Sequence, residues 1–327
     1  MTIETVQGPL RIVVTGATGF VGSALVKALK NHQKYMPISA VRSVPRNDVL
    51  AENSFIIPGI SSNTDWSDGL KDAALVVHAA ARVHVMKEVA ADALAEFRKV
   101  NVEGTINLAR QAAVAGVKRF VFISSIKVNG ESTAAGHPFK ADDCPAPSDP
   151  YGVSKQEAEE ALRKISTETG MEVVIIRPTL IYGPGVKANF RNMMGWLQKG
   201  IPLPFGAIFN KRSLVSIENL VSLILVCLEH PDAAGQAFLV SDGIDLSTTE
   251  LLTRTADALG VKSRLVPIPS SLLVLGAVAL GRRSLSQRLC GSLQVDIQKT
   301  KSLLGWNPPV SVEEALKRTA KDFLEQR

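Results

Sequence analysis

The 327-residue sequence predicts an α/β fold: a doubly wound parallel sheet followed by a smaller C-terminal lobe. In the first half, short apolar runs alternate with longer helical patterns, which is typical of βαβ units. The runs are apolar at nearly every position, as in strands that are buried on both faces. After Pro178, glycine and proline divide the chain into shorter elements. We therefore predict a core at residues 1–178 and a lobe at 179–327, with some of its segments returning to the core.

The expected elements follow one another along the chain. The apolar runs are at 11–15, 37–41, 75–79, 119–124 and 172–178, and the helical patterns are at 20–30, up to 115, and from 151 to 169. Beyond the core we expect a helix at 218–229, a strand at 237–240 and a helix after Ser247. Thr248 and Thr249 precede Glu250 there, which indicates a helix cap.

Composition indicates a compact globular protein, because 46% of the residues are apolar and 21% are charged. The 37 basic and 31 acidic residues are interspersed, and the basic ones show no aromatic interleaving, so no nucleic-acid partner is expected. Cys144, Cys227 and Cys290 are odd in number and far apart. This pattern predicts reduced thiols rather than disulfides, and neither the cysteines nor the histidines have the spacing of a metal site.

The N-terminus lacks a basic region followed by an apolar one, so we expect no secretory signal and a cytoplasmic location. The most apolar stretch, LLVLGAVAL at 272–280, has about half of the roughly 20 residues needed to span a bilayer. No integral membrane segment is expected, and a buried or interfacial helix is favoured over a membrane contact.

A glycine-rich turn follows the first predicted strand and opens the first helix, with the spacing G-x-x-G-x-x-G. Glycines there allow a tight turn and close approach of a pyrophosphate, which the positive end of the helix also attracts. The turn predicts a Rossmann dinucleotide-binding fold. The residues placed at the cofactor are Gly16, Thr18, Gly19, Phe20, Val21 and Gly22.

The end of the second predicted strand bears on the choice of cofactor. NAD-binding proteins usually have a carboxylate there for the ribose hydroxyls, whereas this chain has Ala40-Val41-Arg42. An arginine can pair with a 2′-phosphate through two charge-assisted hydrogen bonds. The expected cofactor is NAD(P), with NADP(H) slightly favoured over NAD(H); a solvated surface arginine is the alternative interpretation of Arg42.

Three side chains form a candidate catalytic set. Tyr151 and Lys155 are four residues apart at the start of a predicted helix and therefore share one face. A nearby cation favours the phenolate, which a tyrosine needs because its ordinary pKa is about 10. Ser125 follows the preceding strand and can hydrogen-bond a reacting oxygen. The set predicts hydride-transfer chemistry with a nicotinamide cofactor, whereas Tyr-x-x-x-Lys alone also fits an ordinary helix start.

Several separated motifs in order resemble the extended short-chain dehydrogenases/reductases, in the NAD-dependent epimerase/dehydratase family. They are Thr15-Gly16-Ala17-Thr18-Gly19-Phe20-Val21-Gly22, His78-Ala79-Ala80-Ala81, Asn101-Val102, Ser124-Ser125, Tyr151-Gly152-Val153-Ser154-Lys155, Arg177-Pro178, Tyr182-Gly183-Pro184-Gly185, Arg212-Ser213-Leu214 and Leu303-Leu304-Gly305-Trp306. The resemblance covers nearly the whole chain. Bacterial UDP-sugar 4-epimerases and 4-ketoreductases look most similar.

The resemblance implies an NAD(P)-dependent oxidoreductase acting at C4 of a UDP-sugar, as a 4-ketoreductase or a 4-epimerase. Arg42 favours an NADPH-using reductase, and the general resemblance favours an epimerase. Sugar dehydratases of the family have an Asp-Glu pair where this chain has Ile126 and Lys127, so a dehydratase is not expected. A non-catalytic protein that senses NADP or serves as a scaffold is the alternative, although such proteins often lose the tyrosine or lysine.

The resemblance also implies further site residues. At the cofactor it places Ala79, Ala80, Ala81, Asn101, Ser124, Tyr151, Lys155 and Pro178. At the UDP-sugar it places Arg82, Lys127, Asn129, Asn189 and Arg212, mainly through the lobe after residue 178. Ser124 is the alternative to Ser125 as the catalytic hydroxyl, and His78 is expected to be a hydrogen-bonded core residue. A homodimer through the helices that begin near Ala90 and Tyr151 is expected by analogy.

Overall fold

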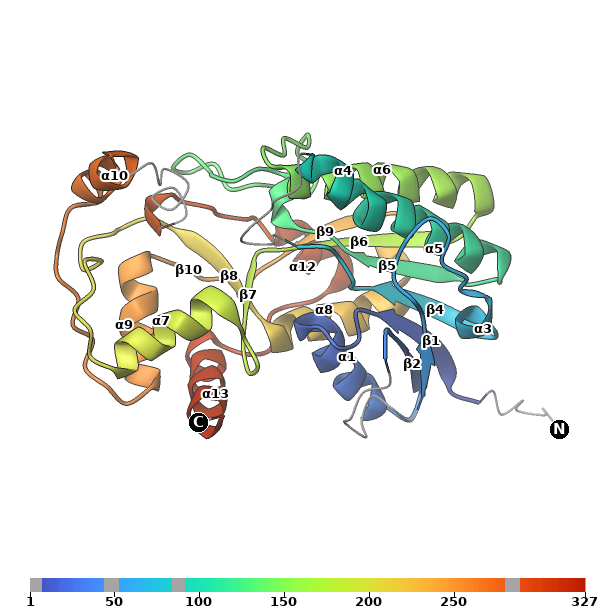
Figure 1. The fold of residues 1–327 in the computed structure, drawn as a ribbon, viewed down its shortest axis with the longest axis horizontal. Coiled ribbons are helices and arrows are strands. Elements are labelled where there is room, and N and C mark those ends of the chain that lie inside the picture. Colours follow the sequence, from blue (N-terminus) through green and yellow to red (C-terminus); the bar gives the residue numbers. More distant parts are fainter. Residues whose placement is uncertain (1–7, 44–52, 84–91, 280–288, 327) are drawn as a thin grey trace. The chain divides into compact units, whose positions relative to one another are not determined.

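The computed structural model describes residues 8–43, 53–83, 92–279 and 289–326 (Figure 1). The chain divides into two compact units. The first unit contains residues 1–128, 144–177 and 223–238, and the second contains 129–143, 178–222 and 239–327. Assigning cofactor binding to 1–178 and substrate binding mainly to 179–327 remains a prediction.

The larger sheet has seven strands in the order β3-β2-β1-β4-β5-β6-β9. Its strands are β1 (Leu10–Thr15), β2 (Tyr35–Val41), β3 (Ser54–Ile56), β4 (Ala73–His78), β5 (Arg119–Ile123), β6 (Glu172–Pro178) and β9 (Ala237–Val240). The pairs from β3 through β6 are parallel. Crossovers run outward on both sides of β1 and β4, as in a Rossmann sheet. The predicted doubly wound α/β fold is confirmed.

Helices cover both faces of the first unit. They include α1 (Phe20–Lys30), α3 (Ser67–Leu70), α4 (Ala93–Arg98), α5 (Gly104–Val114), α6 (Pro150–Thr169) and residues 223–229 of α8 (Ile217–Glu229), which begins in the second unit. Figure 1 shows α1 on one face of the sheet and α4, α5 and α6 on the other. The long helix predicted up to residue 115 is interrupted by a π-helical turn at Lys99–Glu103. Short 3-10 turns occur at Ile126–Val128 and Pro231–Ala233.

The second unit contains a three-stranded sheet in the order β10-β8-β7. Its elements are β7 (Leu180–Tyr182), β8 (Arg212–Ser216), β10 (Asp245–Leu246), α7 (Ala188–Gln198), α9 (Thr248–Ala258), α10 (Ser270–Ala279), α12 (Gln298–Leu304) and α13 (Val312–Glu325). Helices α7, α9 and α13 pack against one another. A capping box formed by Ser247 and Glu250 begins α9, so the cap is Ser247 itself.

The apolar stretch at 272–280 forms most of α10, and Leu280 lies outside the described residues. None of the helix residues is buried, so the interpretation as a buried helix is wrong. Apolar character alone cannot show whether a helix has a partner to pack against. Within the described part of the chain, no helix has the length and apolar character needed to cross a membrane.

Candidate active site

The predicted cofactor residues of the first unit lie at one edge of its sheet. The glycine-rich turn follows β1, Arg42 follows β2, Ala79 follows β4 and Ser124 follows β5. Because these strands are parallel, their carboxyl ends share an edge, which is where open α/β sheets bind ligands. Pro178 is the last residue of β6.

The glycine-rich turn packs directly against the chain after β4. Gly16 has a φ of +67°, and a Cβ there would lie 2.8 Å from the backbone nitrogen of Ala80. A Cβ on Gly22 would lie 2.2 Å from the carbonyl oxygen of Gly16. The backbone conformation and the close packing at these two positions therefore require glycine.

The start of α1 has the properties of an anion-binding site. Gly19 caps the helix without a side-chain hydrogen bond, and the first turn has no acidic residue. The first backbone N–H groups of a helix have no intrahelical partner and attract negative charge. The start of the helix, formed by Thr18, Gly19, Phe20 and Val21, fits the pyrophosphate of a dinucleotide. The exposed Arg42 fits either cofactor form, since it is available for a 2′-phosphate and equally for solvent.

Tyr151 lies in the first turn of α6, and the Ser125 hydroxyl is near enough to lower its pKa. Its ring meets that of Phe97 edge to face, with 6.0 Å between the centroids. Burial raises the pKa of the Tyr151 phenol to about 12, and the negative charge of Asp149 adds to the rise, while the Ser125 hydroxyl opposes it. The phenol is therefore protonated at neutral pH.

Lys155 is fully buried one turn further along α6. Its Nζ donates to the carbonyl oxygen of Ile123 at 2.7 Å and lies 3.8 Å from the centroid of the Phe122 ring. Burial lowers the pKa of Lys155 to about 7, and the negative charge of Glu159 opposes this. The spacing of Tyr151 and Lys155 predicts a cation that lowers the tyrosine pKa. In the structure, burial instead raises the pKa of Tyr151 and lowers the pKa of Lys155.

Glu159 is a buried residue that the sequence analysis missed. Its carboxylate accepts hydrogen bonds from Ser124 Oγ at 2.5 Å and from two nitrogens of Arg177 at 2.9 and 2.6 Å. The side chains of Arg177 and Glu159 are only 4% and 3% exposed. The Ser124 hydroxyl is thus directed at Glu159, whereas Ser125 Oγ accepts a hydrogen bond from the backbone nitrogen of Lys127 at 3.3 Å.

Asn101 joins α6 to the segment after β4. Its side-chain nitrogen donates to Ser154 Oγ and to the Arg82 carbonyl, each at 3.0 Å, and its oxygen accepts from the Arg82 backbone at 2.8 Å. It lies in the π-helical turn, a feature that often occurs at functional sites. His78 is buried between Thr15 and Thr105 and hydrogen-bonded to both, as expected of a core histidine.

The predicted substrate residues lie in both units and differ in their contacts and exposure. In the first unit, Lys127 forms an ion pair with Asp149, the residue that caps α6. In the second unit, the buried Asn129 donates to the carbonyl of Lys140 at 2.9 Å, and Arg212 donates to the carbonyl of Gly291 at 3.0 Å. Asn189 is exposed in the first turn of α7. Their contact with a substrate remains a prediction.

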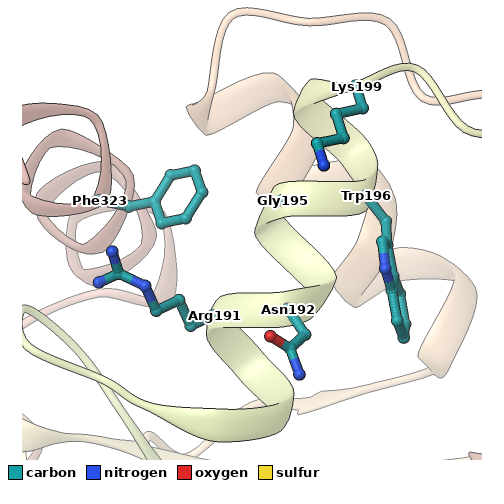
Figure 2. Close-up of a pocket in the computed structure, with 6 residues that line it drawn as sticks. All are labelled: Arg191, Asn192, Gly195, Trp196, Lys199 and Phe323. Carbon is teal, nitrogen blue, oxygen red and sulfur yellow. The ribbon is translucent and has the colours of Figure 1, made fainter. Parts of the chain in front are cut away.

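A small hollow lies on α7 and α13 of the second unit (Figure 2). It has a volume of about 230 Å³ and is lined by Arg191, Asn192, Gly195, Trp196, Lys199 and Phe323. The Arg191 guanidinium lies 5.6 Å from the centroid of the Phe323 ring and donates to Gln326 at 2.6 Å. The hollow is smaller than typical small-molecule sites, and none of the predicted site residues lines it.

Comparisons with known proteins agree with this geometry. Residues 12–241 match the NAD dependent epimerase/dehydratase family. The chain is 52% identical over 319 residues to UDP-glucose 4-epimerase from Vibrio cholerae, covering 97% of this chain and 96% of that protein. It is 28% identical over 327 residues to GDP-6-deoxy-D-mannose reductase from Pseudomonas aeruginosa, covering 96% and 97%. The crystal structure of UDP-glucuronic acid 4-epimerase from Bacillus cereus with NAD has the same fold, with a TM-score of 0.77 at 21% identity over 97% of this chain and 99% of that one.

Proposed function

Since the chain belongs to the NAD dependent epimerase/dehydratase family, we propose that it is a UDP-sugar 4-epimerase that acts on UDP-glucose. The observation that carries the chemistry is the position of Tyr151 in the first turn of α6 and of Ser125 after β5, at the sheet edge beside the glycine-rich turn. The identity of the sugar rests on the relative from Vibrio cholerae, which is 52% identical.

The proposed roles follow from the groups at this edge. A nicotinamide cofactor, which Gly16, Gly19 and Gly22 would hold by its pyrophosphate, would supply hydride acceptor and donor chemistry at sugar C4. Tyr151 takes the proton from the 4-hydroxyl as the ketone forms and gives it back as the ketone is reduced. Ser125 hydrogen-bonds the reacting oxygen and keeps it next to the phenol. Overall, only the configuration at C4 changes.

The buried side chains of Tyr151 and Lys155 suit the two proton transfers of this reaction, protonation of the ketone and removal of the proton from the 4-hydroxyl. With its pKa raised to about 12, the Tyr151 phenol holds a proton and is in the correct form to protonate a ketone. Proton removal from the sugar requires the phenolate, which a positive charge stabilises. Lys155, on the same face of α6, is the candidate for that charge, and Glu159 favours its protonated form.

A 4-ketoreductase is the second candidate function, favoured by Arg42 and by the 28% identical reductase. We propose NAD as the cofactor from the family description, whereas Arg42 at the end of β2 supports NADP. Replacing Arg42 by Ala separates these alternatives in a binding titration. If Arg42 binds a 2′-phosphate, the substitution weakens NADP binding about tenfold or more and leaves NAD binding unchanged.

The function is tested by incubating the purified protein with UDP-glucose and NAD and following C4 inversion by NMR. We expect UDP-galactose without net formation of reduced cofactor. Tyr151→Phe should lower turnover by at least about 100-fold while cofactor binding persists. Tyr35→Phe is the matched control, since Tyr35 lies at the start of β2 and pairs with Glu229. Unchanged turnover in Tyr151→Phe, or stoichiometric cofactor consumption with a UDP-4-keto sugar and no C4 inversion, would contradict the proposal.

A further inference from the structure

Helix α10 presents an unusual apolar surface. From Leu272 to Ala279 the sequence is LLVLGAVA, without a polar or charged side chain. Leu272, Leu275 and Val278 are 58%, 67% and 49% exposed, and none of the helix residues is buried. Single exposed apolar residues are common in proteins, but a contiguous group of this kind marks a site of interaction.

The chain before α10 is anchored to its own unit. The backbone nitrogen of Leu203 donates to the carbonyl of Arg264 at 2.9 Å, and that of Val266 donates to the carbonyl of Leu203 at 2.8 Å. An isolated bridge pairs Ala207 with Pro269, immediately before the helix. Among the described residues, in contrast, no helix or strand makes more than isolated contacts with α10. The helix is thus anchored at its start, and the described helices and strands do not pack extensively on its apolar side chains.

Charge distinguishes between possible partners for this helix. The sequence from Lys262 to Arg288 contains five basic residues, Lys262, Arg264, Arg282, Arg283 and Arg288, and no acidic residue. Lys262 and Arg264 are exposed, and the other three lie outside the described residues. A second copy of the chain would bring like charges together, whereas an anionic lipid surface attracts them. An apolar helix of this length suits the bilayer interface, because it is too short to span the hydrocarbon core.

We propose that α10 docks on the surface of a bilayer that contains anionic lipid. Its leucine and valine side chains enter the boundary between headgroups and acyl chains, while Lys262 and Arg264 contact the headgroups. Apolar burial and electrostatic attraction both contribute, as in other peripheral membrane helices. The chain is bound peripherally, and the proposal does not depend on which sugar the enzyme uses.

The test is flotation of the full chain with vesicles of phosphatidylglycerol and phosphatidylethanolamine. The triple variant Leu272→Ser, Leu275→Ser, Val278→Ser should lower the partition coefficient by at least about tenfold. These side chains are exposed, so circular dichroism and the thermal midpoint should stay unchanged. Val114→Ser is the matched control, since Val114 is 91% exposed on α5, and it should bind like the unmodified chain.

The electrostatic contribution has its own measurement. Lys262→Gln with Arg264→Gln should weaken binding, and so should added salt or replacement of the anionic lipid by phosphatidylcholine. The proposal is overturned if the unmodified chain does not float with the anionic vesicles, or if the triple variant floats equally well. If the unmodified chain does not bind vesicles but sediments as a dimer, and the triple variant sediments as a monomer, the surface binds a second copy of the chain instead. None of these measurements uses sugar turnover, so their outcome is separate from that of the proposed function.

Discussion

Glu159 is the residue that links the candidate catalytic groups to the interior of the first unit. It receives hydrogen bonds from Ser124 and Arg177, and its charge raises the pKa of Lys155 against the effect of burial. Burying an ion pair costs desolvation energy, and removing only one partner is strongly destabilising because the other charge is left buried without a counterion. We therefore expect Glu159 and Arg177 to behave as one unit.

Glu159→Gln should lower the free energy of unfolding by about 3–5 kcal/mol, because it leaves the charge of Arg177 buried without a counterion. The double variant Glu159→Leu, Arg177→Met should recover most of this loss. Urea unfolding of the single and double variants gives the coupling energy. The pair Arg98 and Glu157, also on α6 but with side chains 46% and 28% exposed, is the control and should contribute less than about 1 kcal/mol. Additive losses in the double variant would refute the coupling.

The candidate catalytic residues could be predicted because their chemistry and spacing are local. Tyr151 and Lys155 are four residues apart on one helix, and Ser125 follows an apolar run. Glu159 has the same spacing from Lys155, but an isolated glutamate on a helix usually faces solvent. Its burial comes from Arg177 on β6 and Ser124 after β5, which are brought together only by the sheet.

At the scale of elements, the start of α6 positions Tyr151. Asp149 accepts a hydrogen bond from the backbone of Gly152 at 2.6 Å, and Pro150 occupies the first turn. A Cβ on Gly152 would lie 2.9 Å from the carbonyl oxygen of Lys127, so this turn packs closely on the segment after β5. Asp149 is thus both the helix cap and a negative charge that raises the pKa of Tyr151.

Asp149→Asn separates these two contributions, because asparagine caps a helix about as well as aspartate but carries no charge. The pKa of Tyr151 should fall below about 12, while stability near neutral pH decreases only through loss of the ion pair with Lys127. The pKa values of the other two tyrosines, Tyr35 and Tyr182, are also raised, so the phenolate absorbance that the folded protein loses in Tyr151→Phe identifies the Tyr151 titration. Asp149→Ala, which also loses the cap, should be less stable than Asp149→Asn by about 1 kcal/mol. An unchanged Tyr151 titration would show that the Asp149 charge does not act on Tyr151.

Elements with an apolar or periodic pattern were predicted closely, including the four-residue strand β9 (Ala237–Val240), whereas the two-residue strand β10 was not. The bounds of α1 and β6 agree with the apolar pattern at 20–30 and 172–178. The two-residue strand β10 has no periodicity of its own and exists because Asp245 and Leu246 pair with β8. The π-helical turn at Lys99–Glu103 was also missed, because one wider turn leaves the helical pattern nearly unchanged.

At the scale of the whole molecule, alternation of apolar runs and helices is enough to predict the parallel sheet, but it does not show how the chain divides into units. Residues 223–238 belong to the first unit and 129–143 to the second through contacts between distant parts of the sequence. Such contacts leave no local pattern. The exposure of α10 is a similar case, since its composition is the same whether or not a partner covers it.

Stability of the whole fold should depend on pH through Lys155, which is buried only in the folded state. Burial lowers its pKa from 10.5 to about 7 in the folded protein, so between these values the unfolded chain binds more protons. The free energy of unfolding therefore rises with pH across this window, by up to about 1.4 kcal/mol per pH unit from this group. Below about pH 7 both states hold the proton, and the slope from Lys155 vanishes.

Lys155→Met keeps an unbranched side chain in the same space and removes the titration. Urea unfolding at several pH values from about 7 to about 10 should show stability of the unmodified chain rising relative to the variant. The raised pKa of Tyr151 acts only above pH 10, where it lowers stability as pH rises, so the two effects fall in different windows. A constant or falling difference between the two proteins would mean that Lys155 keeps a normal pKa in the folded state. In that case Lys155 already carries a full positive charge at neutral pH, on the same face of α6 as Tyr151, and is the cation that the phenolate needs.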